Sequence, residues 1–214
     1  MNTREKILDR ALEMFNERGI EYVGLRELAA VLDMRVSNIT YYFPTKDDLV
    51  YQLSQELSLK NSEVIVDNKD LSMSGFLVML QKVFENHYQY RGLLRSFVHI
   101  MTQNKQVLAS YKKTQTSRKA TLSSNIHTLV KAGYIKVEND EELNFLVSAL
   151  AIISRYWISE AAVFGQHVNK EQQVSKNLIM VTNLFMPYAS PKAKREMETF
   201  REELVATKSE TNMR

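Results

Sequence analysis

Short hydrogen-bonding side chains gather between residues 35 and 46, in a stretch with two basic residues and no acidic one. Ser37, Asn38, Thr40 and Tyr41 can each donate or accept a hydrogen bond over a short reach. Such groups suit the base edges and phosphate oxygens of a nucleic acid. The stretch therefore predicts contact with a duplex if one element holds these side chains on a single exposed face.

Residues for catalysis, metals and cofactors are not arranged in known motifs. The four histidines, at positions 87, 99, 127 and 167, form no His-Glu-x-x-His motif and no Glu-x-x-His pair. The chain has no cysteine, which excludes disulfides, thiolate metal sites and cysteine nucleophiles. The six glycines never approach the spacing of a phosphate-binding loop. We therefore expect no enzyme activity, no metal and no cofactor.

The chain has 214 residues, of which 44% are apolar, enough for one large or two small domains. A charged N-terminus without an apolar segment predicts no secretory signal. No uncharged apolar run of about 18 residues is present, so no membrane partner is expected. These features predict a soluble, cytoplasmic protein.

Apolar residues recur at helical spacing and never alternate over a useful length, which predicts an all-α fold. Thr3 is expected to cap the first helix and Gly19 to end it. A short helix should follow Gly24, and a fourth helix of about 20 residues should begin at Lys46. The remaining helices are expected at residues 36–43, 74–90, 91–101, 105–132, 141–164, 171–187 and 191–206.

The second and third helices are separated only by a turn at Asp33-Met34, which predicts a helix-turn-helix buttressed by the first helix. Asp tolerates the left-handed conformation that such a turn needs. Small Ala29 and Ala30 should let the two helices approach closely. The residues expected to close the apolar wedge are Phe15, Leu28, Ile39 and either Tyr42 or Phe43.

The stretch from Leu28 to Leu49, with its Tyr-Phe-Pro-Thr-Lys-Asp core, resembles the N-terminal domain of TetR/AcrR-type transcriptional regulators. The first helix also matches that family at Ile7, Leu8, Ala11, Leu12, Phe15 and Gly19. The resemblance covers about a quarter of the chain. It implies a homodimer that binds a palindromic DNA operator and releases it when a small molecule enters the C-terminal domain.

The resemblance implies DNA contacts at the positions of this chain that match the family's motif. Lys46 matches the lysine that contacts a backbone phosphate, and Val36, Ser37 and Asn38 are candidate base readers. The full set of expected DNA-binding residues is Arg26, Arg35, Val36, Ser37, Asn38, Thr40, Tyr41, Tyr42 and Lys46. The chain departs from the family pattern at Gly24, Asp33, Arg35 and Thr40, and Thr40 replaces a phosphate-contacting tyrosine.

The segment from Leu143 to Phe164 carries only two charged residues, Arg155 and Glu160. A helix that is apolar nearly all round must be buried on several sides, here by its own domain and a second subunit. With residues 177–185 it would form a four-helix interface of a two-fold homodimer. That symmetry places two recognition helices about 34–36 Å apart, one turn of duplex.

Polar groups amid these helices could instead line a cavity for an unknown small-molecule effector. The candidates are His87, Tyr88, Arg95, His99, Arg155, Tyr156 and Trp157. Each could equally be a structural residue, with Arg155 paired to Glu160. Residues 86–137 hold nine basic residues and no acidic one. That block is either a solvated helix face, an attraction for an anionic effector, or a long-range attraction for DNA.

The predicted organisation is a helix-turn-helix DNA-binding domain at residues 1–47, a helical effector-binding and dimerisation domain at 48–207, and a flexible tail at 208–214. The predicted function is a ligand-responsive transcriptional regulator, a repressor. The alternative is a helical protein-interaction module with weak or lost DNA binding, because residues 1–50 carry a net charge of −2.

Overall fold

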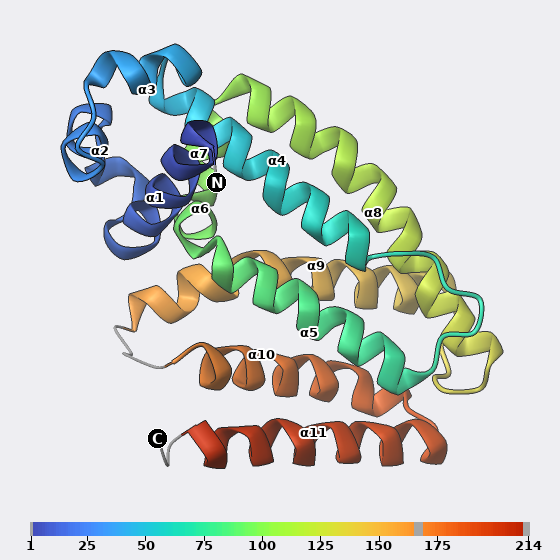
Figure 1. Ribbon diagram of the computed structural model, residues 1–214. Coiled ribbons are helices and arrows are strands. Elements are labelled where there is room, and N and C mark those ends of the chain that lie inside the picture. The colour runs from blue at the N-terminus through green and yellow to red at the C-terminus, as the bar shows by residue number, and fades with distance from the viewer. Residues whose placement is uncertain (1, 165–168, 212–214) are drawn as a thin grey trace. The chain divides into compact units, whose positions relative to one another are not determined.

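A computed structural model describes residues 2–164 and 169–211, and side chains as far as residue 206. These parts are helical and contain no strand, only an isolated bridge between Ile135 and Ala189. The all-α prediction is confirmed. The elements, labelled in Figure 1, are α1 (Thr3–Arg18), η1 (Ile20–Tyr22), α2 (Leu25–Val31), α3 (Val36–Tyr42), α4 (Lys46–Val64), α5 (Met73–Gln89), α6 (Arg91–Arg95), α7 (Phe97–Gln103), α8 (Lys105–Lys131), α9 (Asp140–Val163), α10 (Lys170–Phe185), η2 (Met186–Tyr188) and α11 (Pro191–Thr211).

The chain divides into two compact units that are not simple halves of the sequence. The first unit combines Met1–Lys60 with Gln89–Thr114, and the second combines Asn61–Tyr88 with Gln115–Arg214. Helices α4 and α8 therefore contribute residues to both units. The last helix continues to Thr211, past the predicted end at residue 206 and into the segment expected to be a tail, whose residues 212–214 lie outside the described part.

Helix α1 is closed at both ends by local hydrogen bonds. Its N-cap is Asn2, not Thr3 as predicted, because the Asn2 side chain accepts the N–H of Glu5 while the Glu5 carboxylate accepts the N–H of Asn2. This reciprocal capping box satisfies two backbone donors that a helix start leaves unpaired. At the other end Gly19 adopts a φ of 93° and donates its N–H to Phe15, so the predicted end is confirmed.

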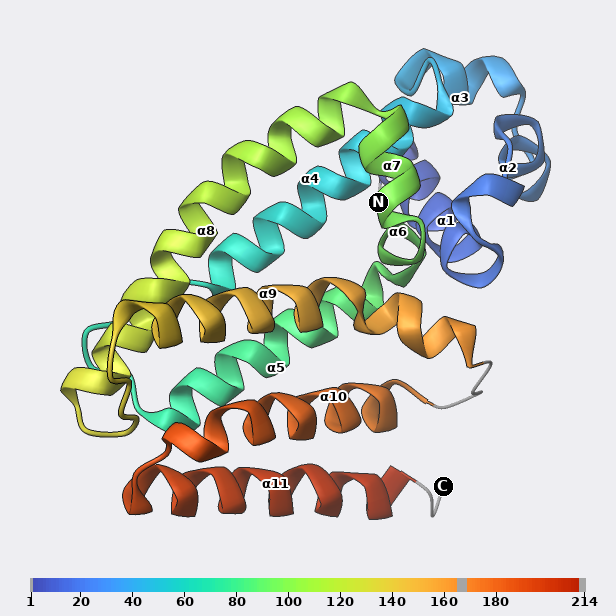
Figure 2. The same cartoon turned by 180° about the vertical axis from the view of Figure 1, so that it is seen from behind.

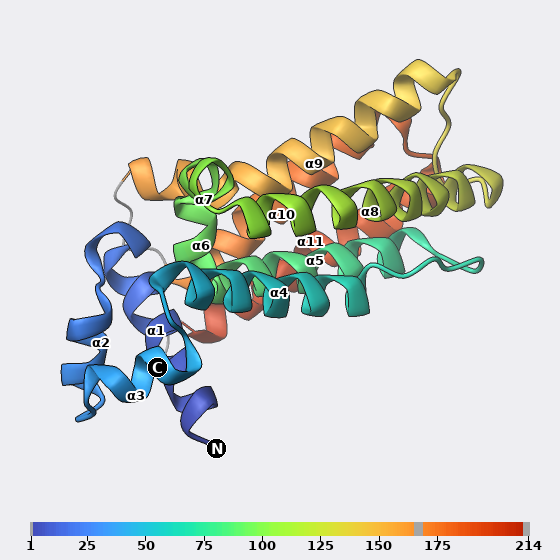
Figure 3. The ribbon, with the colours of Figure 1, turned by 90° about the horizontal axis from the view of Figure 1, so that it is seen from above.

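Helices α2 and α3 form the expected helix-turn-helix beside α1 (Figures 1 and 3). Asp33 occupies the left-handed region with a φ of 51°, and Met34 donates its N–H to the carbonyl of Ala29 at 2.9 Å. Ala29 is buried as predicted, whereas Ala30 is exposed and takes no part in the helix contact.

The core of the first unit contains the predicted wedge residues Phe15, Leu28, Ile39 and Phe43. Of the two aromatic alternatives, Phe43 is 2% exposed and Tyr42 is 39% exposed, so Phe43 closes the wedge. Residues from the later segment 89–114 complete this core, namely Tyr90, Leu93, Ile100 and Val107. The core of the first unit is therefore assembled from two separate parts of the chain.

The single helix predicted at residues 91–101 is two short helices, α6 and α7, which meet at Ser96. Ser96 has φ −97° and ψ 21°, outside the α-helical range, and ends the hydrogen-bonding pattern of α6. Its hydroxyl donates to a carboxylate oxygen of Glu21 at 2.9 Å. A side-chain bond to another helix thus accompanies the break, which no pattern of apolar residues could have indicated.

In the second unit, α9, α10 and α11 lie side by side, as the views in Figures 1 and 2 agree. Helix α10 buries one stripe of apolar residues at helical spacing, Val174, Leu178, Val181 and Phe185. Two backbone hydrogen bonds of 2.8 Å, from Lys136 to Tyr188 and from Ser190 to Tyr134, tie the loop after α8 to the start of α11.

Candidate nucleic-acid interface

Helix α3 buries only Ile39; Thr40 is half-buried, and the other side chains of the helix are exposed. Ser37 and Asn38 are exposed, and the ring of Tyr41 is 80% exposed and meets Tyr42 edge to face. A helix that was part of a closed core would bury more of such a short, partly aromatic sequence. The rest of the first unit does not cover the polar face of α3, so this face is free to contact another molecule.

The nine predicted DNA-binding residues all belong to the first unit and retain solvent access. Thr40 and Lys46 are half-buried, and the other seven are exposed. The exposed ones are Arg26, Arg35, Val36, Ser37, Asn38, Tyr41 and Tyr42. The helix-turn-helix thus brings together the residues that the sequence analysis selected.

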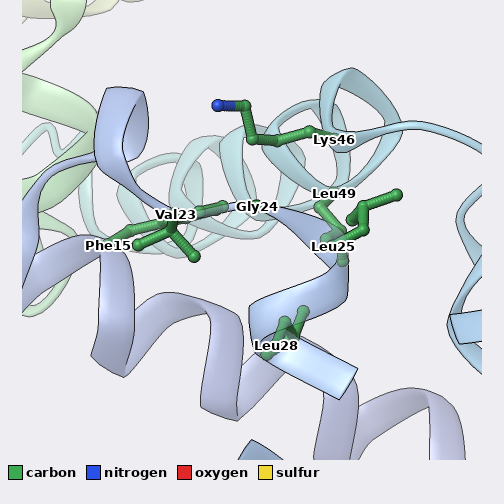
Figure 4. A pocket seen from close by; sticks show the side chains of 7 residues that line it. All are labelled: Phe15, Val23, Gly24, Leu25, Leu28, Lys46 and Leu49. Atoms are coloured by element: carbon green, nitrogen blue, oxygen red, sulfur yellow. The ribbon is translucent and has the colours of Figure 1, made fainter. Parts of the chain in front are cut away.

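The side chain of Lys46 is partly engaged within the unit, which the sequence did not indicate. Its Nζ donates to the carbonyl oxygen of Ile20 at 3.0 Å. Figure 4 shows the lysine beside a small apolar crevice, which leaves no room for a bound molecule. An ammonium group has three donors, so one bond to Ile20 leaves two for a phosphate. The bond also holds the start of α4 against η1.

Further contacts link α1 to the helix-turn-helix. The guanidinium of Arg4 lies 5.2 Å from the ring centroid of Phe43, so α1 contacts the end of α3. Arg18 forms an ion pair with Glu27 and donates to the carbonyl of Tyr22 at 3.3 Å. Together these contacts position α2 and α3 relative to α1.

Departures from the family pattern have local consequences. Gly24 and Arg35 stand at the N-caps of α2 and α3, and neither provides a side-chain capping bond. The hydroxyl of Thr40 donates to the carbonyl of Ser37 at 3.4 Å, so it is turned toward its own helix. By contrast, α4 is well capped, because Thr45 and Asp48 exchange side-chain and backbone hydrogen bonds.

Helices α1 and α6 cap each other, a feature missed by the sequence analysis. Asn16 accepts the N–H of Gly92 at 2.8 Å and donates to the carbonyl of Gln89 at 2.8 Å. In return, Arg95 donates to the carbonyls of Phe15 and Asn16 at the end of α1. An asparagine followed by an arginine 79 residues later carries no recognisable sequence signal.

Comparison with known proteins identifies the chain's relatives. Residues 7–53 match the family described as bacterial regulatory proteins of the tetR family, and residues 52–197 match the family described as bacterial transcriptional repressors under the name TetR. The second match covers more than half of the chain. The chain belongs to the TetR family.

Individual relatives agree with this TetR-family assignment. The chain is 36% identical over 121 residues to the probable HTH-type transcriptional regulator YttP of Bacillus subtilis, covering 52% of this chain and 58% of that protein. It is 30% identical over 73 residues to the HTH-type transcriptional regulator LuxR of Vibrio harveyi, covering 34% and 36%. The aligned part of the chain thus spans about a third to three-fifths of these relatives.

Solved structures share the fold along almost the whole chain. A TetR-family transcriptional regulator from Marinobacter aquaeolei VT8 superposes with a TM-score of 0.86 at 22% identity, over 95% of this chain and 99% of that one. A γ-butyrolactone receptor described as ArpA-like superposes with a TM-score of 0.63 at 13% identity, over 94% and 96%. At these identities the likeness shows the shared fold alone.

The seven predicted ligand-binding residues of this TetR-family chain are divided between the two units. Arg95 and His99 belong to the first unit, where Arg95 caps α1 and His99 is exposed on α7. The five in the second unit are His87, Tyr88, Arg155, Tyr156 and Trp157. Among these only His87 and Trp157 are buried.

The remaining second-unit candidates lie nearer the surface. The guanidinium of Arg155 lies 5.9 Å from the ring centroid of the adjacent Tyr156, which is itself 39% exposed. Two polar residues that the sequence analysis missed, Asn61 and Asn125, are instead buried in this unit. Asparagines inside long helices are indistinguishable by pattern from surface ones, so no sequence signal could have selected them.

Helix α9 is the one helix in the described ranges that is long and apolar enough to cross a membrane, with a mean hydropathy of 1.3 over its most apolar window. The core helix of a water-soluble protein can satisfy the same criteria. Within those ranges, no three His, Asp or Glu side chains come together in a way that could hold a metal ion.

Proposed function

We propose that this TetR-family chain is a DNA-binding transcriptional repressor that acts in the cytoplasm. The observation that carries the proposal is helix α3, which buries Ile39 alone and presents Ser37, Asn38 and Tyr41 to solvent. In a helix-turn-helix the second helix enters the major groove, where such side chains meet base edges. The cations Arg26, Arg35 and Lys46 would contact phosphates and set the register.

A homodimer would match a palindromic operator, and the surface of α9 supports one. Phe145, Ile152, Tyr156 and Val163 are all exposed, and their spacings of seven and four residues place them on one face of the helix. A contiguous exposed apolar stripe of this kind is typical of a protein interface. Two copies of the stripe would pack across a two-fold axis.

An effector would then act by favouring a conformation of the dimer whose recognition helices no longer fit the operator. A ligand shifts such an equilibrium only by its difference in affinity for the two conformations, typically about 1–3 kcal/mol of coupling. The effector would bind in the second unit, between helices.

Selection of bound duplexes from a random pool tests the DNA-binding proposal directly. An inverted repeat with half-sites one helical turn apart is the expected product. Asn38→Ala should relax base preference at one position of each half-site, whereas Gln106→Ala, an exposed residue of the same unit, should not. Recovery of no preferred sequence, together with salt-independent binding, would favour a protein-interaction module instead.

The dimer proposal has its own test. Ile152→Lys should convert the dimer to a monomer in sedimentation velocity, because it places a charge in the middle of the apolar stripe. It should also weaken operator binding, since each half-site would then be bound alone. An Ile152→Lys variant that remained a dimer would move the interface away from this face of α9.

A further inference from the structure

In the second unit, polar side chains from the end of α4 and from α5 form a largely buried cluster that lies near Ser154 of α9. The amide oxygen of Asn61 accepts a hydrogen bond from Nδ2 of Asn86 at 3.1 Å. Its amide nitrogen must therefore face Nε2 of His87, which lies 3.1 Å away and acts as the acceptor. This arrangement places the ring proton of His87 on Nδ1.

Two N–H donors of this cluster have no acceptor. Nδ1 of His87 and Nε1 of Trp157 are both buried, and neither has a hydrogen-bond partner among the described residues. The carbonyl of Ser154 favours the protonated ring of His87 but forms no hydrogen bond with Nδ1. His87 lies near the carbonyl of Ser154, which is one turn before Trp157 on α9, and the rings of His87 and Trp157 both stack on Phe84.

The electrostatic surroundings of the donors are positive. The guanidinium of Arg118 lowers the pKa of His87, and no carboxylate among the described residues raises it. Nη2 of Arg118 donates to the hydroxyl of Ser62 at 3.2 Å. His87 and Arg118 both belong to the acid-free segment 86–137. The cluster therefore combines hydrogen-bond donors with positive charge.

An apolar ring accompanies the donors. Phe84 stacks on Trp157, with ring centroids 5.4 Å apart, and on His87, with centroids 6.3 Å apart. Buried donors without acceptors are costly, and a ligand that supplies acceptor oxygens removes that cost. A buried anion in turn requires a cation close by. A ligand with an anionic oxygen group on an apolar body would accept from the two donors, pair with the cation and pack against the ring.

We propose that this cluster binds a small monocarboxylic acid with an apolar body. Its carboxylate oxygens accept hydrogen bonds from Nδ1 of His87 and Nε1 of Trp157, and the guanidinium of Arg118 balances the charge. The apolar body packs against Phe84. This inference rests on the proposed function only in assigning the bound acid the role of effector.

Trp157 is the single tryptophan of the chain, so its fluorescence reports the site directly. The probes are butyrate, hexanoate, octanoate, benzoate and phenylacetate, each with the amide and the primary amine of the same carbon skeleton. At least one acid should give a saturable change in emission. Its amide should bind at least tenfold more weakly, and its amine should give no saturable change. No response to any acid, or an amine that binds as well as its acid, would overturn the proposal.

Variants assign the response to named donors. His87→Phe keeps a planar ring but removes the Nδ1 donor, so it should weaken binding of the responding acid by at least tenfold in titration calorimetry. Arg118→Gln should reduce the preference for the acid over its amide by a similar factor. Because Arg118 is half-buried, this variant still tests the site if His87→Phe does not fold. His127→Gln, an exposed histidine of the same unit, is the matched control and should bind normally. Unchanged binding in both folded test variants would refute the assignment.

Operator binding separates this inference from the proposed function. A protein that selects an inverted repeat but shows no response to the acids retains its proposed function and loses this ligand class. A protein that binds the acid through His87 but binds no DNA keeps the site and loses the regulatory role. If both hold, the acid should reduce operator affinity in the wild type but not in His87→Phe.

Discussion

Helix α3 of the first unit and the buried cluster of the second unit use their polar side chains in opposite ways. In the first unit, α3 buries a single residue and presents its hydrogen-bonding groups to solvent. In the second unit, Asn61, His87 and Asn125 are buried, and their hydrogen bonds are made inside the unit. The exposed groups of α3 cost nothing to solvate, whereas the buried groups must be paired to avoid destabilising the fold.

This difference determines how easily the binding preference of each region can change without a loss of stability. An exposed polar face can be exchanged residue by residue with little effect on folding, so it can adapt to a new base sequence. A buried polar cluster is coupled to packing, so a change in what it binds also changes stability.

The largest effect should come from Gly92, at the junction of α6 with α1. A Cβ atom there would lie 2.5 Å from the carbonyl oxygen of Phe15, and backbone cannot yield as a side chain can. Gly92→Ala should therefore lower the free energy of unfolding by about 3 kcal/mol or more in urea titrations. At Gly24 nothing lies within 4 Å of such a Cβ atom. Gly24→Ala should therefore change the free energy of unfolding by no more than about 1 kcal/mol. Equal effects at the two glycines would show that the junction adapts freely.

The next effect is a pH dependence of the second unit. The pKa of His87 is lowered to about 4, mainly by burial; the carbonyl of Ser154 opposes the shift, and the guanidinium of Arg118 adds to it. The unfolded chain, with a histidine pKa of about 6.5, then binds more protons than the folded one between about pH 6.5 and pH 4. The contribution of His87 to the free energy of unfolding is therefore fully present above that window. It falls by about 3 kcal/mol as the pH drops through the window.

His87→Gln should remove this part of the pH dependence, measured as the difference in urea unfolding between pH 7 and pH 4.5. Because His127 is exposed, the control His127→Gln should retain the wild-type difference. Identical pH profiles for His87→Gln and the wild type would mean that the ring is not held neutral in the folded protein.

A smaller effect tests whether Lys46 serves DNA as well as the fold. Its Nζ already donates to Ile20, and a phosphate contact would use its remaining donors. Lys46→Ala should weaken operator binding about tenfold and reduce the slope of log affinity against log salt by about one. Lys113→Ala, at an exposed position of the acid-free segment in the same unit, should leave the slope unchanged. A lower slope for Lys113→Ala would show that this segment attracts DNA at long range.

The smallest effects compare equivalent caps in the two units. Asn2 caps α1 and Asn139 caps α9, each by accepting one backbone N–H. Replacing either with alanine should lower the free energy of unfolding by about 1 kcal/mol. A clearly larger loss at Asn2 would show that the capping box with Glu5 contributes beyond a single hydrogen bond.

The fold of the first unit could be predicted because its signals are local. The apolar spacing from Ile7 to Phe15, the turn at Asp33 and the Tyr-Phe-Pro-Thr-Lys motif each depend on neighbouring residues. Errors were also local. Asn2 rather than Thr3 caps α1, and the helix expected at 91–101 is broken at Ser96.

The features that escaped prediction join distant residues. Asn16 meets Gly92, Ser96 meets Glu21, and Asn61 meets His87, and no periodicity links the members of these pairs. His87 and Trp157 were selected as polar residues in apolar surroundings, but the sequence could not show that they share Phe84 as a stacking partner. Such pairings are decided by packing in three dimensions.

The mutual capping of α1 and α6 has a practical consequence for engineering. A fragment cut at residue 60 would lose Tyr90, Leu93, Ile100 and Val107 from its interior and leave the last carbonyls of α1 without Arg95. Chimeras that graft this helix-turn-helix onto another protein should therefore carry residues 89–114 along with it. The transferable unit is defined by tertiary contacts between two segments of the chain, so a single cut in the gene does not isolate it.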